Sequence, residues 1–152
     1  MQEQIIKFET AKLAKEKGFI WDVKEAYYAD KDELSKRMRE ECWDGYPVNT
    51  EDEAYLAAPT QEQLKKFIRE ERGVHIEIGR NASGYYWVMC KSDGGTDLGY
   101  SDFSGPNASG VWDKYEDAFE DALQVQLYTD LKKVKGHWSN YSEFAIKRYA
   151  LK

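Results

Sequence analysis

The sequence has little of several features that mark well-known classes of protein. Its 152 residues include only two cysteines, Cys42 and Cys90, which are too few for a disulfide framework. It contains no run of about 18 apolar residues, as a membrane-spanning helix would require, and its first residues lack the apolar core of a secretory signal. These absences predict a cytoplasmic protein with free thiols and no membrane partner.

Recognisable catalytic and metal-binding patterns are missing as well. The chain has no P-loop, no G-x-G-x-x-G pattern and no G-x-S-x-G elbow, and His75 and His137 do not stand at zinc-ligand spacing with either cysteine. The stretch "DGGTDLGYSD" departs from a calcium loop, because Gly95 replaces an oxygen ligand and Leu98 replaces the glycine of the turn. We therefore predict no enzyme activity, no metal site and no cofactor.

What the chain does have is enough apolar surface for one packed domain. Apolar residues make up 41% of the sequence and aromatic residues 14%, which argues against general disorder. A chain of this length suits a single domain over residues 1–152. Residues 30–58 are the exception, since acidic residues outnumber basic ones there and the pattern is irregular. We interpret this segment as a variable acidic excursion.

Four helices are predicted from their ends and from their apolar stripes. The stretch "ETAKLAKEK" stops at Gly18, with Phe19 expected to fold back on the last turn. The second helix begins with a T-x-x-Q capping box at Thr60 and Gln63 and stops at Gly73. A long helix is predicted over about 113–134, with Asp113 and Glu116 at its start, and a final helix after Ser139.

Between the second and third of these helices the apolar period changes from 3.6 to 2. Residues 74–78 alternate as in a strand with one buried face, and "GYYWVMC" at 84–90 reads as a second, central strand. "RNASG" supplies the turn of an antiparallel hairpin, and an irregular third strand is expected around residues 100–103. We therefore predict an α+β fold, in which a small antiparallel sheet of two or three strands packs helices on one face.

Three stretches carry a resemblance. "FETAKLAKEKGF", "APTQEQLKKFIREERGVHIEI" and "YEDAFEDALQ" occur in this order, and they resemble a group of small uncharacterised proteins encoded by gut bacteria and by their phages and other mobile elements. Phe67 stands where such proteins often have tryptophan, a conservative difference within the apolar stripe. The resemblance implies a phage or mobile-element setting, and it supplies no functional residue.

Aromatic residues are concentrated in the strand region, beyond what a small core requires. Alternation places Tyr85 and Trp87 on one face of their strand and Tyr86 on the other, so that one set is expected to be exposed. Exposed aromatic side chains mark binding surfaces. The candidate surface comprises Tyr85, Trp87, Tyr100 and Trp112. Burial in the core, or against a second copy of the chain, is the alternative explanation.

The C-terminal segment departs most from the average composition. Residues 132–152 contain six Lys or Arg and one Glu, a net charge of +5 in a chain whose total charge is −6. Basic side chains among aromatic ones can bind single-stranded nucleic acid, although ordinary packing and helix-dipole compensation explain the same pattern. The residues concerned are Lys132, Lys133, Lys135, Trp138, Tyr141, Lys147 and Arg148.

These observations predict a non-enzymatic accessory protein of a phage or mobile element that binds another protein, with a homo-oligomer as one form of that interaction. The alternative is a nucleic-acid-associated protein that acts through the basic, aromatic segment 132–152. The negative total charge disfavours duplex DNA, because neutralising phosphates requires a basic surface.

Overall fold

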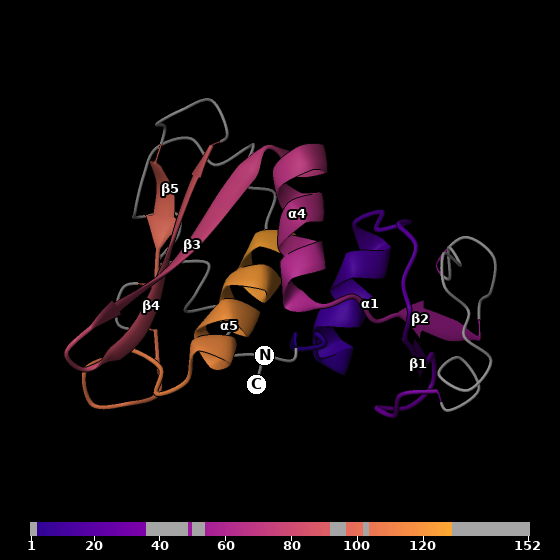
Figure 1. The fold of residues 1–152 in the computed structure, drawn as a ribbon, viewed down its shortest axis with the longest axis horizontal. Coiled ribbons are helices and arrows are strands. Elements are labelled where there is room, and N and C mark those ends of the chain that lie inside the picture. Colours follow the sequence, from indigo (N-terminus) through magenta and orange to yellow (C-terminus); the bar gives the residue numbers. More distant parts are fainter. Residues whose placement is uncertain (1–2, 36–48, 50–53, 92–96, 102–103, 129–152) are drawn as a thin grey trace. The chain divides into compact units, whose positions relative to one another are not determined.

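A computed structural model describes residues 3–35, 49, 54–91, 97–101 and 104–128 (Figure 1). The chain divides into two compact units, Met1–Leu64 and Lys65–Lys152. Together they contain helices and two small antiparallel sheets, one of two strands and one of three. The predicted α+β class is thereby confirmed.

The first unit is built on helix α1 (Phe8–Glu16) and on strands β1 (Ala26–Tyr28) and β2 (Tyr55–Ala57). The two strands pair antiparallel, with Ala26 opposite Ala57. Neither strand was apparent in the sequence, because each has three residues and the segment between them is acidic and irregular. The buried side chains of this unit are mainly apolar and include Ile6, Phe8, Ala11, Ala14, Phe19, Val23, Leu56 and Leu64.

Helix α1 ends as its glycine predicts. Gly18 has a φ of 86°, and its N–H donates to the carbonyl of Lys15. The N–H of Phe19 donates to the carbonyl of Ala14 over 2.9 Å. These two bonds form a Schellman motif, which satisfies carbonyls that the end of a helix leaves open. Phe19 is thereby turned inward and is fully buried.

Helix α4 (Gln61–Arg72) begins at the predicted cap and ends at the predicted glycine. The Thr60 hydroxyl accepts a hydrogen bond from the N–H of Gln63 over 3.1 Å, as expected. The Gln63 side chain does not return to Thr60, as the other half of a capping box would; its amide donates to the carbonyl of Asp22 over 2.7 Å. Gly73 ends the helix with a φ of 69° and leads directly into the next strand.

The second unit contains the three-stranded sheet, formed by β3 (Val74–Asn81), β4 (Gly84–Lys91) and β5 (Asp97–Tyr100) in that order. β3 and β4 form the predicted hairpin, with Asn81 opposite Gly84. The Asn81 carboxamide oxygen accepts the N–H groups of Ser83 and Gly84 and so holds the turn. The third strand lies slightly earlier in the chain than expected.

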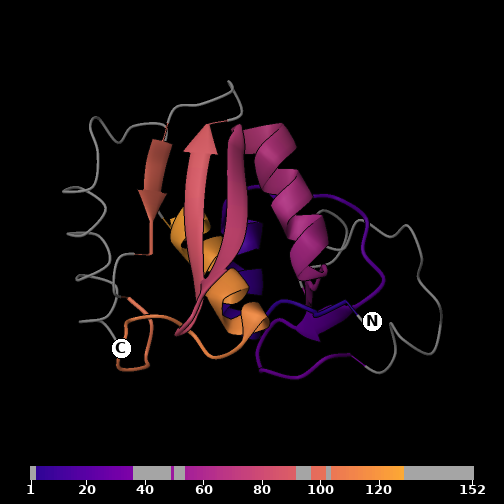
Figure 2. The ribbon, with the colours of Figure 1, turned by 60° about the vertical axis from the view of Figure 1, so that its left-hand side comes forward.

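Helix α5 (Tyr115–Tyr128) covers one face of this sheet; Figure 2 shows it behind β3 and β4. Its predicted stripe is buried at Phe119, Ala122, Leu123 and Leu127. The described helix begins after Asp113, whose carboxylate accepts instead from the side chain of Asn107. The part of the expected helix beyond residue 128, and the expected final helix, lie outside the described residues.

The second half of α4 runs beside α5 in the same direction (Figure 1). Near one end of this pair, the Lys65 ammonium lies 5.9 Å from the centre of the Phe119 ring. Near the other end, the Arg72 guanidinium donates to the side-chain oxygen of Gln126 over 2.9 Å. Both ends are thus held by a polar or cation–π contact.

Candidate functional site

The two faces of the three-stranded sheet differ sharply in character. On the face toward α5, β3 and β4 pair apolar residues: Ile76 lies opposite Met89, and Ile78 opposite Trp87. Ile76, Met89 and Trp87 are buried. This face therefore belongs to the core of the second unit.

The opposite face carries a mixed apolar and polar surface that no described helix covers. Val88 lies at its centre, paired with Glu77 of β3 on one side and Tyr100 of β5 on the other. The side chain of Val88 is 37% exposed, which is high for an apolar residue of a central strand. We call this surface the open face; it comprises His75, Glu77, Tyr86, Val88, Cys90 and Tyr100.

Tyr86 is held flat on the open face by the residue opposite to it. Its cross-strand partner is Gly79, and a methyl group at that position would overlap the Tyr86 ring. The absence of a side chain at Gly79 therefore gives the ring its place. A half-buried aromatic ring on an ordered strand offers contact area at little conformational cost, as rigid anchors of interfaces do.

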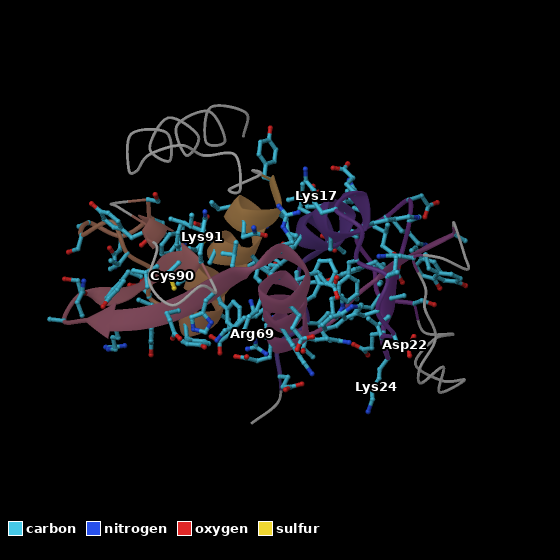
Figure 3. The ribbon with its side chains drawn as sticks, turned by 90° about the horizontal axis from the view of Figure 1, so that it is seen from above. Lys17, Asp22, Lys24, Arg69, Cys90 and Lys91 are labelled. Carbon is cyan, nitrogen blue, oxygen red and sulfur yellow. The ribbon has the colours of Figure 1, made fainter. Side chains whose placement is uncertain are left out.

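The polar groups of the open face lie on β3 and at the end of β4 that pairs with the start of β3. The His75 Nε2 and Glu77 Oε1 atoms are 2.5 Å apart, and both side chains are partly exposed. Cys90 lies opposite His75 in the register, near the end of β4 (Figure 3).

Of the four aromatic residues predicted to form a surface in this region, two lie in the core. Trp87 is fully buried, and its indole Nε1 donates to the Asp121 carboxylate over 2.9 Å. Trp112 is buried too, and its backbone forms an isolated bridge with Tyr85. The candidate surface therefore does not include Trp87 or Trp112, because helix α5 covers the face to which Trp87 points.

The other two of the four are half-buried and lie on different surfaces. Tyr100 belongs to the open face. Tyr85 points to the side of α5, where its ring packs edge-on against Tyr115 at 5.8 Å between ring centres. The Arg80 guanidinium lies 4.9 Å from the Tyr85 ring, so that cation and ring stabilise each other.

Sequence reasoning placed Tyr86 on the face opposite to Trp87 but did not include it, or Val88, in the candidate surface. Alternation along β4 was the signal that separates the two sets. Alternation alone does not say which set the helices cover. The seven predicted residues from Lys132 to Arg148 lie outside the described residues.

Neither a cluster of metal ligands nor a membrane-spanning helix occurs in the described part of the chain. No group of three or more of its His, Cys, Asp or Glu side chains is arranged to hold a metal ion. Among the same residues, no helix combines the length and the apolar character needed to cross a bilayer.

Comparisons of the chain with protein families, with curated proteins and with solved structures find no match. We take the open face as the candidate site because of its exposed apolar centre and its tyrosines.

Proposed function

We propose that this chain is a non-enzymatic interaction protein, acting in the cytoplasm in the setting of a phage or mobile element, and that it binds another protein through the open face. The exposure of Val88 carries the proposal. A central strand is normally covered on both faces or polar on the outer one, whereas here an exposed aliphatic residue lies beside Tyr100 of β5 and two positions after Tyr86 of its own strand.

The composition of the open face suits a protein partner. Tyrosine is enriched at interfaces because its ring supplies apolar contact area and its hydroxyl can still find a hydrogen-bond partner. Tyr86 and Tyr100 flank Val88 in this way, and the His75–Glu77 pair supplies a polar rim on one side. An apolar centre with a polar rim is the ordinary anatomy of a protein–protein interface. The phage or mobile-element setting rests on the sequence resemblance.

Site-specific photo-crosslinking in the native host tests the proposal. A photoreactive amino acid at Val88 should yield a discrete crosslinked protein, and Tyr86→Lys or Tyr100→Lys in the same chain should remove that product. The matched control is the same amino acid at Glu70, which is exposed on α4. Equal products from positions 70 and 88, or none from either, would contradict the proposal. A product with twice the chain's mass would identify the partner as a second copy.

A further inference from the structure

Strand β3 is an edge strand whose outer side has no hydrogen-bond partner in the described part of the chain. It is eight residues long and lies at the end of the sheet order. Apart from its ladder with β4, no backbone hydrogen bond of residues 74–81 occurs among the described residues. Long uncovered edge strands are uncommon in proteins, because an open row of N–H and C=O groups can pair with a strand of another chain. Most edge strands are short, are covered by another element or contain proline.

The hydrogen bonds of β4 identify the β3 groups that point outward. The N–H and C=O of Tyr85 both bond Trp112, on the side of β4 away from β3, and the C=O of Trp87 bonds Ser101 on that same side. Because these directions alternate along an antiparallel strand, Tyr86 and Val88 bond β3 instead.

The register between β3 and β4 then shows which residues of β3 direct their backbone groups toward β4 and which direct them toward the free edge. The partners of Tyr86 and Val88 are Gly79 and Glu77, which must point their backbone groups toward β4. The residues between and beside them, Ile76, Ile78 and Arg80, therefore direct their N–H and C=O groups to the free edge.

We propose that this edge accepts an extended segment of a partner protein as a fourth strand, antiparallel to β3. Residues directly opposite in an antiparallel pair share a face, so partner residues that bond Ile76 and Ile78 would lie on the apolar side toward α5. The partner residue between these two would lie opposite Glu77, beside its exposed carboxylate. The segment that fits alternates apolar with basic side chains. The inference goes beyond the proposed function. It shares Glu77 with the open face, but the main-chain bonds of an added strand form at the edge of β3 and do not require a partner on the open face.

The length of β3 selects this edge over the opposite one. β5 has four residues, so that a strand added there would gain few ladder bonds. β3 also has no proline, and its single outward-bonding charged residue, Arg80, lies near the hairpin turn. β-Strand addition gains affinity from such main-chain bonds and specificity from alternate side chains.

A pair of N-methylated peptides tests the proposal on the full chain without altering it. The probe is the peptide Thr-Val-Lys-Val-Lys-Val-Thr. Its valines would face the side of α5, so their N–H groups would bond β3. N-methylation of the valines should therefore weaken binding by at least about tenfold, whereas N-methylation of the lysines should leave binding unchanged. Equal affinity of the two methylated peptides, or no binding of the parent peptide, would overturn the proposal.

Amide hydrogen exchange by NMR locates the bound peptide. In the free protein, Glu77 and Gly79 should exchange slowly and Ile76, Ile78 and Arg80 quickly; the peptide should slow the latter three. Protection of these three amides that grows with protein concentration and without peptide would instead identify a second copy of the chain as the occupant, and would overturn the proposed partner.

A proline variant supplies the matching control on the protein side. Ile78→Pro removes an outward N–H and leaves the ladder with β4 intact, so it should abolish binding, whereas Ile78→Val should bind as the parent does. Peptide binding by Ile78→Pro at parental affinity would contradict the proposed edge.

Discussion

The indole Nε1 of Trp87 and the Oδ2 of Asp121 lie 2.9 Å apart, and this hydrogen bond joins the central strand β4 to the helix that covers it. Both side chains are buried. A buried indole N–H without an acceptor loses its hydrogen bond to water and gains nothing in return, so the carboxylate at this point of α5 is part of the reason why such a large side chain can occupy the core.

Replacing Asp121 by alanine should therefore lower the free energy of unfolding by about 1–3 kcal/mol, because the Trp87 N–H is left unsatisfied. Asp121→Asn retains an acceptor oxygen and should cost less. Urea denaturation followed by circular dichroism measures both differences. A parental midpoint for Asp121→Ala would show that water or another group takes over the bond.

Gly73→Ala should cost about 1 kcal/mol or more. The φ of Gly73 is 69°, and a methyl group there would meet no atom within 4 Å, so the cost is conformational strain alone. Gly73→Asn should be less damaging, since asparagine tolerates the left-handed region better than alanine does. Thermal unfolding ranks the three proteins. The reverse order for alanine and asparagine would count against backbone strain as the cause.

Thr60→Ala should destabilise the protein by about 1 kcal/mol, since the N–H of Gln63 loses its acceptor at the start of α4. Thr60→Ser keeps the hydroxyl and serves as the matched control, with an expected change of only a few tenths of a kcal/mol. Equilibrium denaturation of both variants measures the difference. If serine and alanine cost the same, the methyl group of Thr60 matters and the cap does not.

Asn107→Ala should loosen the segment between β5 and α5. The Asn107 side-chain oxygen accepts the N–H groups of Ser109 and Val111, each at 3.0 Å, and its amide nitrogen donates to the carbonyl of Ser83. Losing these three bonds should cost about 1.5–4.5 kcal/mol, at a net value of roughly 0.5–1.5 kcal/mol for each bond.

Hydrogen exchange at the Ser109 and Val111 amides checks this prediction locally. Both should exchange faster in Asn107→Ala than in the parent chain, because the acceptor oxygen is lost. Unchanged exchange in the alanine variant would mean that the backbone bonds of the loop hold it without the side chain.

Local signals in the sequence were enough to predict where several helices and strands begin or end. Gly18 and Gly73 mark helix ends because the bonds that close a helix involve only the neighbouring turn. Thr60 marks a helix start for the same reason. The change of period at Gly73 announces β3, since a strand with one buried face alternates whatever it packs against. The asparagine of "RNASG" also signals the turn that follows β3.

Other features depend on residues far apart in the chain. The pairing of β1 with β2 is an example, because short strands in an irregular segment carry little periodicity. Asn49 is another: its side-chain oxygen accepts the N–H of Ala57 and its amide donates to the carbonyl of Phe19, thirty positions away. The Gln63 side chain likewise bonds Asp22 and not the cap that its spacing suggests.

The candidate site also has one part that local sequence determines and one part that depends on distant residues. The sequence by itself determined that β4 carries two sets of aromatic side chains on opposite faces, because alternation is a property of the extended backbone. Only the tertiary structure decided which set is exposed. Helix α5 lies on the face of Trp87, where Asp121 satisfies the indole, and so Val88 and Tyr86 are left on the open face. That choice depends on where a helix packs 34 residues further along the chain, and no local pattern contains it.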